Sequence, residues 1–272
     1  MTKTKIPRIK RIVIDRQMEN LVAYPHPLFK QQMDELVERY DKPEFAMSDP
    51  VQFPRRYNRK QDAEIVAFLI ATIAWGRREM IINSSERLLN MMGESPYDYV
   101  MNVSFDKIDA SKSLHRTFFG RDLIYIIKGL REIYGCHDSL EDMFVGDEAW
   151  QGIDRFRQAM HNANGCFSKH IANPEKSACK RLHLALRWLV RNDGIVDLGI
   201  WNKVKPSQLI IPLDVHVGEI ARMLKITSRH SNDRQAACEI TQVLRSLDSE
   251  DPIKYDFALF GAGIELAKEK KE

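Results

Sequence analysis

One stretch of the sequence, residues 62–77, is apolar on nearly every side when it is placed on a helix. A helix on a protein surface keeps one polar face, so a helix without such a face has to lie inside a bundle of other helices. Asp62 and Glu64 stand near its beginning, where the positive end of a helix favours acidic side chains. The stretch therefore predicts a buried central helix, and the fold has to surround it. Its apolar residues are Ile65, Val66, Phe68, Leu69, Ile70, Ile73, Ala74 and Trp75.

Most of the remaining chain also shows helical spacing of apolar residues, whereas alternating strand patterns are nearly absent. The segment 209–213 is at most an isolated extended piece. A chain of 272 residues can bury a sizeable core, and we predict an all-α fold. We expect a soft boundary near residue 60, with an N-terminal arm and helix (1–60) packed on a helical domain (61–272). Further helices are predicted at 27–40, 78–92 with Gly93 as its stop, 114–134, 150–161, 175–191, 215–224, 233–247 and near the C-terminus.

Composition and charge exclude some classes of protein and leave others open. No apolar run approaches the ~20 residues that span a bilayer, and the first 16 residues lack the apolar core of a signal peptide, so we expect a cytoplasmic protein that does not enter membranes.

The net charge of +3 and the pI of about 8.6 permit nucleic-acid binding without requiring it. Two basic blocks are either solvated surface or DNA contacts. They are Lys3, Lys5, Arg8, Lys10, Arg11 and Arg16, and then Arg55, Arg56, Arg59 and Lys60.

The four cysteines are scattered, with no Cys-x-x-Cys pair that would indicate a zinc site or an iron–sulfur cluster. We therefore predict reduced, mostly buried thiols, and neither a metal nor a cofactor. The cysteines are Cys136, Cys166, Cys179 and Cys238.

Lys180 is the first candidate for chemistry. Pro174 and Ser177 are suitable helix starts, with Asn173 or Ser177 as the N-cap. They place Lys180 in the first turn or two of a helix, off its apolar stripe. The positive end of that helix and the neighbouring Arg181 both disfavour an ammonium ion, and a nucleophile has to be a neutral amine. The ordinary alternative is a solvated lysine. The stripe consists of Leu182, Ala185, Leu186, Leu189 and Val190.

Asp214 is the second candidate. It follows the apolar run 209–213 and precedes a predicted helix, which is the usual place of an N-cap. A capping carboxylate has a fixed orientation, and a helix start after a buried run opens beside a cleft. His216 is more simply explained as structural. Further along, Asp251 and Pro252 predict the N-cap and first residue of a closing helix, whose Gly261 and Gly263 permit close helix packing.

These segments resemble the helix-hairpin-helix DNA glycosylases. Pro212-Leu-Asp214-Val-His216-Val is similar to the Pro-Val-Asp-x-His segment that carries their catalytic aspartate, and residues 68–76 and 251–263 look like their early buried helix and their closing helix. The resemblance covers roughly residues 60–265.

Three features depart from the common pattern of that superfamily. No Gly-x-Gly-x-Lys-Thr hairpin precedes Asp214, Ile195 occupies the usual lysine position, and Ala74-Trp75 replaces a Ser-Gln pair. Lys180 lies further upstream, as in the archaeal 8-oxoguanine glycosylase branch. The chain also resembles an uncharacterised bacterial family that is related to these enzymes mainly through its C-terminal half.

The resemblance implies a helical bundle of two lobes with a cleft between them, and a base-excision repair enzyme. Lys180 would attack C1′ of a damaged nucleotide, with 8-oxoguanine the favoured base, and Asp214 would assist; strand cleavage as an AP lyase could follow. The partner would be damaged DNA, duplex or single-stranded, and the protein a monomer. Candidate DNA contacts are Lys176, Arg181, Arg55 and Arg56. Candidate residues of the base pocket are Trp75, Trp188, Trp201 and His216.

Two other functions remain open at this point. One is a DNA-binding relative that has kept the fold without the chemistry, as the altered hairpin suggests. The other is a metal-dependent phosphohydrolase, for which His137-Asp138 is the only signal, and metal sites of that kind need further ligands on facing helices.

Overall fold

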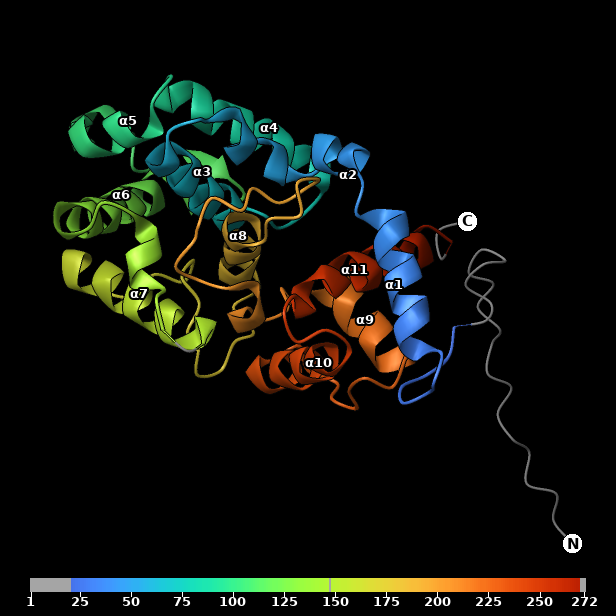
Figure 1. Ribbon diagram of the computed structural model, residues 1–272. Helices are drawn as coiled ribbons and strands as arrows, with labels where there is room; N and C mark the ends of the chain where they lie inside the picture. Colours follow the sequence, from blue (N-terminus) through green and yellow to red (C-terminus); the bar gives the residue numbers. More distant parts are fainter. Residues whose placement is uncertain (1–20, 147, 270–272) are drawn as a thin grey trace, which may run out of the picture.

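The computed structural model describes residues 21–146 and 148–269, and within them the chain is mostly helical (Figure 1). The predicted all-α class is thus confirmed. The basic block between Lys3 and Arg16 lies outside the described residues. The α-helices are α1 (Phe29–Tyr40), α2 (Pro43–Ser48), α3 (Lys60–Thr72), α4 (Arg78–Met92), α5 (Pro96–Asn102), α6 (Gly120–Cys136), α7 (Ala149–Asn164), α8 (Lys180–Val190), α9 (Val215–Met223), α10 (Arg234–Leu247) and α11 (Tyr255–Glu269).

Short elements connect these helices. The strands β1 (Ser113–His115) and β2 (Phe118–Phe119) form an antiparallel hairpin. The helix expected from residue 114 therefore begins at Gly120, because the chain first turns back through Arg116 at a φ of 49°. The 3-10 turns are η1 (Pro50–Gln52), η2 (Pro54–Arg56), η3 (Phe105–Lys107), η4 (Leu140–Met143), η5 (Pro206–Gln208) and η6 (Pro252–Lys254).

The predicted central helix is α3, which is buried from Asp62 to Thr72 and packs against α8. It ends five residues earlier than expected. Both acids near its start are buried and accept hydrogen bonds: Asp62 Oδ1 from the Tyr97 amide at 2.7 Å, and Glu64 Oε1 from the Trp201 indole at 2.7 Å. Both side chains therefore connect α3 to distant segments, in addition to their favourable interaction with the positive end of the helix.

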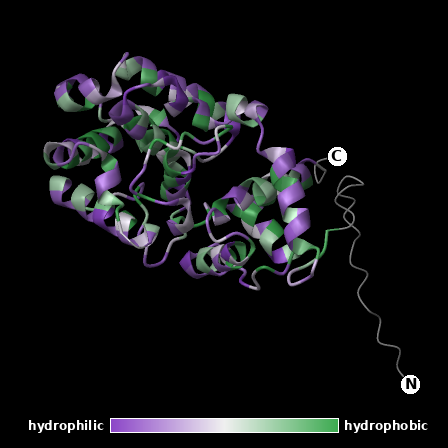
Figure 2. Cartoon of the chain, in the orientation of Figure 1, coloured by the Kyte–Doolittle hydropathy of each residue, from purple (hydrophilic) through white to green (hydrophobic). Residues whose placement is uncertain are grey.

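The helices form two groups (Figure 1). We call α3–α8 the large lobe and α1 with α9–α11 the small lobe. In the small lobe α11 packs against both α1 and α9, and hydrophobic residues follow much of α11 in Figure 2. The first described helix thus packs beside the last one. The domain boundary near residue 60 stays a prediction.

Gly261 and Gly263 permit the close packing of α11 that was predicted. A Cβ on Gly261 would lie 2.3 Å from the ring of Tyr40 in α1, and one on Gly263 would lie 2.8 Å from Cβ of His216 in α9. Either distance is too short for a Cβ contact, so only glycine allows these helices to approach as they do. None of the described helices is long and apolar enough to cross a membrane.

Candidate active site

Asp214 is the N-cap of α9, as predicted. Its Oδ1 accepts hydrogen bonds from the backbone amides of His216 at 2.9 Å and Val217 at 3.0 Å. Asn232 donates to the Asp214 carbonyl at 2.8 Å and is itself held by Arg222 at 2.9 Å. The cap occupies one carboxylate oxygen and leaves Oδ2 available for another partner.

Lys180 is the first residue of α8. The helix was predicted from residue 175, so it starts five residues later than expected. Cys179 adopts a left-handed conformation with φ of 46° and separates α8 from the turn and bridge residues before it, 174–177. That segment is held to the start of α10 by a β-bridge between Ser177 and Asp233 and by a hydrogen bond from Arg234 to the Pro174 carbonyl at 3.0 Å. Neither Asn173 nor Ser177 is the N-cap of α8.

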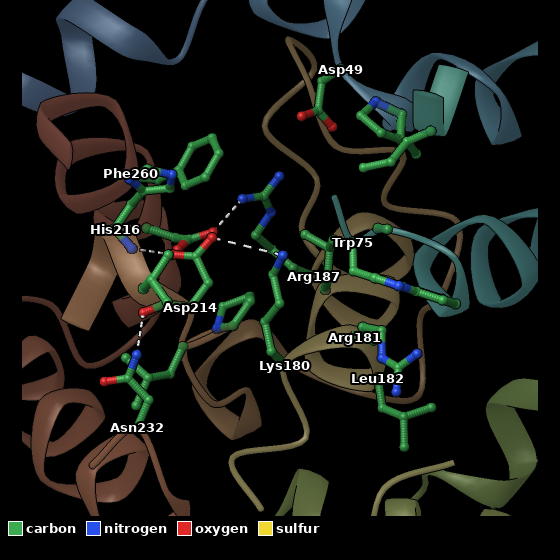
Figure 3. Close-up of a pocket in the computed structure, with 18 of the residues that line it drawn as sticks. Asp49, Trp75, Lys180, Arg181, Leu182, Arg187, Asp214, His216, Asn232 and Phe260 are labelled. Carbon is green, nitrogen blue, oxygen red and sulfur yellow. Dashed lines mark hydrogen bonds and ion pairs between the residues drawn. The ribbon is translucent and has the colours of Figure 1, made fainter. Parts of the chain in front are cut away.

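The starts of α8 and α9 bring the two candidate residues together (Figure 3). Nζ of Lys180 lies 3.7 Å from Oδ2 of Asp214, with 31% of the lysine side chain and 14% of the aspartate side chain exposed. This is an ion-pair distance, and a small closure or one water molecule would permit proton transfer. An amine and a carboxylate from two lobes therefore share one site that solvent can reach.

The pair lies in a pocket with a volume of about 890 Å³ between the lobes. That volume is within the ~300–1,000 Å³ of typical small-molecule sites. The pocket wall combines aromatic rings with charged groups from both lobes. Its side chains include Phe45, Asp49, Trp75, Arg78, His170, Lys180, Arg181, Arg187, Asp214, His216, Asn232, Asp256 and Phe260.

Trp75 and His216, two of the candidate base-pocket residues, line the pocket, and so does Arg181, which was a candidate DNA contact. The Trp75 ring stacks on His170 with 5.5 Å between centroids, and the Arg181 guanidinium lies 5.1 Å from the centre of the Trp75 ring. Arg181 also donates to the Thr72 carbonyl at 2.8 Å, and burial lowers the pKa of Arg181. These contacts stabilise the pocket wall.

Trp188 and Trp201 do not line the pocket, so their prediction as base-pocket residues is wrong. Trp188 is fully buried within α8. Trp201 is buried against Phe68 and Phe144 and donates to Glu64. Both rings are part of the core, where large aromatic side chains bury the most apolar surface.

The cations predicted to contact DNA differ in their surroundings. Arg56 is paired with Glu86 at 2.6 Å and lies over the Phe53 ring, and Arg55 donates to the Val196 carbonyl at 2.6 Å. Lys176 is exposed outside the pocket, and Arg181 lies within it. Of the four, Arg55 and Arg56 are thus engaged within the protein, and the DNA contacts stay predictions.

Asp256 in α11 is a buried pocket residue that the sequence analysis missed. One of its oxygens accepts a hydrogen bond from Arg187 in α8, and the other, Oδ1, is buried with no hydrogen-bond partner among the described residues. Burial raises the pKa of Asp256 to about 6; the negative charge of Asp214 acts in the same direction, while Arg187 opposes it. Its only sequence signal was its place in the closing helix.

Asp49, between α2 and η1, is a second pocket carboxylate that was missed. Its Oδ1 accepts a hydrogen bond from the Val51 amide at 3.1 Å, and its Oδ2 lies 3.6 Å from the guanidinium of Arg78. Burial raises the pKa of Asp49, and the charges of Arg78, Arg187 and Lys180 partly counteract it. An Asp before Pro50 indicates only a local turn, so no sequence signal marks it as a pocket residue.

A cluster of charged groups around the buried Arg191 joins the lobes. Arg191 at the end of α8 pairs with Asp197 at 2.6 Å, Asp251 at 3.0 Å and Asp193 at 3.0 Å, and lies 3.9 Å from Asp41 after α1. Asp251 was predicted to cap the closing helix. It makes no side-chain cap, because both of its carboxylate oxygens are bonded to Arg191 instead.

Other sequence candidates lie away from the pocket. His137 is beside Asp142 at 3.7 Å, and no group of three or more His, Cys, Asp or Glu residues that could hold a metal is found in residues 21–146 and 148–269. Cys136 and Cys166 are exposed rather than buried, and all four thiols are free.

Comparison with known proteins gives one match. The profile of a family described as protein of unknown function (DUF2400) matches residues 49–265, which include Asp49, Lys180, Asp214 and Asp256. No curated protein and no solved structure matches the chain. Since the matched segment covers most of the sequence, the chain belongs to the DUF2400 family.

Proposed function

We propose that this protein is a DNA glycosylase with an associated AP-lyase activity, and that Lys180 and Asp214 carry its chemistry. The observation that supports this most directly is the 3.7 Å between Nζ of Lys180 and Oδ2 of Asp214 in a pocket between two helical lobes. The two-lobed helical arrangement agrees with the helix-hairpin-helix glycosylase fold that the sequence resembles.

The proposed reaction begins when the neutral amine of Lys180 attacks C1′ of the damaged nucleotide. The bond between C1′ and the base breaks, and the base leaves with the bonding electrons and takes up a proton. While C1′ and the base separate, the negative charge of Asp214 stabilises the positive charge that develops on the sugar; Asp214 then accepts the proton that the newly attached amine loses. Opening of the sugar ring then gives a Schiff base between Lys180 and C1′, from which the 3′ phosphate can be eliminated.

Such a reaction requires the base to leave the DNA stack and enter a pocket. The space between the lobes is large enough for a nucleobase and combines aromatic and charged groups. By its resemblance to the archaeal branch, 8-oxoguanine is the first base to test. We expect the protein to act as a monomer in the cytoplasm.

Borohydride trapping tests the proposal. The wild-type protein, incubated with an oligonucleotide that carries one 8-oxoguanine or one abasic site, should form a covalent adduct when borohydride reduces the Schiff base. Lys180→Gln should form none, while Lys112→Gln, an exposed lysine outside the pocket, should react as the wild type does. Circular dichroism would establish that both variants are folded.

The outcomes separate the proposal from its main alternative. Adduct formation that persists in Lys180→Gln would show that another residue is the nucleophile. DNA binding without any adduct, across a panel of duplex and single-stranded lesions, would instead support a non-catalytic DNA-binding relative.

A further inference from the structure

Asp49 and Arg78 form a pair of complementary groups on the large-lobe side of the pocket. Figure 3 shows the Asp49 carboxylate directed into the pocket that holds Lys180 and Asp214. Only 11% of the Asp49 side chain is exposed, against 40% for Arg78, and the separation of 3.6 Å exceeds the length of a hydrogen bond. The two groups are therefore neighbours that still have bonding capacity for a third partner.

That capacity can be counted from the hydrogen bonds of each group. An ionised carboxylate offers about four acceptor positions, and the Val51 amide occupies one of them on Oδ1 of Asp49. The guanidinium of Arg78 has five N–H donors, and its hydrogen bond to Ser48, at 3.5 Å, is long. The pair thus presents one donor followed by two acceptors, in the order Arg78, Oδ2 and Oδ1.

We infer that the Asp49–Arg78 pair reads the Watson–Crick edge of a guanine-type base in the pocket. This edge displays an acceptor at O6, a donor at N1–H and a donor at N2–H, which is the complement of the order that the pair presents. Arg78 donates to O6, and the two oxygens of Asp49 accept from N1–H and N2–H. The assignment rests on the proposed function, since it requires a base to occupy the pocket.

The other bases match the pair less well. Adenine and cytosine each display a single amino group beside a ring nitrogen acceptor, which would face a carboxylate oxygen. Thymine places one N–H between two carbonyl oxygens, so one of these would also face the carboxylate. An unpaired acceptor against a buried carboxylate is costly, and this cost excludes the wrong base more strongly than the correct contacts favour the right one.

Aromatic residues beside the pair supply a surface for the face of the base. Phe45 of α2 and Phe260 of α11 both line the pocket, are half-buried, and have ring centroids 6.2 Å apart in an edge-to-face arrangement. Phe45 lies next to Arg78, whose guanidinium is 5.8 Å from the centre of its ring. Stacking on such rings is tolerant of base identity, so discrimination falls to Asp49 and Arg78.

Two lesions that differ by one donor test the assignment. The 2-amino group of 8-oxoguanine is missing in 8-oxohypoxanthine, which keeps O6 and N1–H. We expect wild-type protein to release 8-oxoguanine about 10-fold to 100-fold faster in single-turnover assays, since a hydrogen bond to a charged group is lost with the amino group.

Two variants should respond to these lesions in different ways. In Asp49→Asn, the rate of 8-oxoguanine release should fall about 30-fold, measured relative to the rate of cleavage at a preformed abasic site. The ratio of the release rates of 8-oxoguanine and 8-oxohypoxanthine should shrink to about 3-fold or less. Arg78→Gln should slow both lesions by a similar factor, because both display O6. Asp154→Asn, an exposed aspartate on α7, should match wild type throughout. Arg78→Gln also keeps the test valid if Asp49→Asn fails to fold.

The possible failures are distinguishable. If the wild type is not trapped on abasic DNA, the proposed lyase chemistry is wrong and the base-reading role is lost with it. If abasic DNA is trapped but 8-oxoguanine is not released, or if Asp49→Asn keeps the full preference for the 2-amino group, the base-reading role is wrong while the lysine chemistry stands.

Discussion

The two oxygens of the Asp214 carboxylate have different partners, so the structural and the chemical roles of this residue can be separated. Oδ1 accepts from two backbone amides at the start of α9, and Oδ2 lies 3.7 Å from Lys180. Asparagine caps a helix about as well as aspartate, but its amide cannot accept a proton from an amine.

Asp214→Asn should therefore retain the stability of the wild type and lose about 100-fold or more of the rate of adduct formation. Asp214→Ala should lose both, with a free energy of unfolding lower by about 1 kcal/mol. Urea denaturation measures the first quantity and single-turnover borohydride trapping the second. An Asp214→Asn protein that traps DNA at the wild-type rate would exclude a role for the carboxylate in proton transfer.

Local signals explain which site residues could be predicted. Asp214 was predictable because a helix start after an apolar run specifies a cap, and Lys180 because it was expected within the first two turns of a helix, off its apolar stripe. Asp49 and Asp256 come from segments far apart in the chain, and only folding brings them to one pocket. Trp201 was assigned wrongly because a tryptophan in an apolar segment looks the same whether it faces a pocket or the core.

At the scale of elements, the longer helices were predicted in their correct order, although some of their ends were not. The short helices α2 and α5 and the β1–β2 hairpin were missed. The start of α8 at Lys180 depends on the left-handed conformation of Cys179. Residues other than glycine adopt it rarely, and no sequence pattern announces it. The first residue of α9 was predictable because the side chain of Asp214 itself forms the cap. A helix start can thus be predicted from the sequence where a capping side chain determines it, as in α9. It cannot be predicted where an unusual backbone conformation determines it, as in α8.

The contact between α11 and α9 gives a prediction at this scale. Gly263→Ala should lower the free energy of unfolding by about 1–3 kcal/mol, because the new methyl group would lie 2.9 Å from the carbonyl oxygen of His216 and would push the first turn of α9 away. The same shift would displace Asp214 and lower the rate of adduct formation. Thermal or urea unfolding measures the first effect.

Gly135→Ala in α6 is the matched control. Apart from the two neighbouring residues and the backbone of α6 itself, no atom lies within 4 Å of the added Cβ, so the substitution should be neutral or stabilise the helix by about 0.5–1 kcal/mol. Equal destabilisation by both substitutions would mean that the close approach of α11 to α9 is not what requires glycine at position 263.

At the scale of the whole molecule, the buried carboxyl group of Asp41 in the charge cluster predicts that the free energy of unfolding depends on pH. Burial raises the pKa of Asp41 from 3.8 to about 6. Between these two values the native state binds more protons than the unfolded state, so the contribution of Asp41 to the free energy of unfolding falls as the pH rises from about 4 to 6. Above pH 6 the ionised carboxylate remains unfavourable.

Asp41→Asn should accordingly be more stable than the wild type at pH 7, by on the order of 1 kcal/mol, and the difference should vanish at pH 4. Arg191 keeps its other three carboxylate partners in this variant. Urea denaturation at both pH values, with Asp154→Asn as the surface control, measures the effect. A variant less stable than the wild type at pH 7 would show that attraction between Asp41 and Arg191 outweighs burial.

The packing of α1 against α11 also bears on how the chain is made. The Arg39 guanidinium reaches Glu265 at 3.2 Å, and the Tyr255 hydroxyl donates to Asp34 at 2.8 Å, so the earliest described helix is completed by the latest one. On the ribosome, α1 emerges before α11, and the residues between Tyr40 and Tyr255 are made before its neighbour appears. The side chains of α1 that are buried in the folded protein, Phe29, Met33 and Leu36, therefore lack the cover of α11 until that helix has been made.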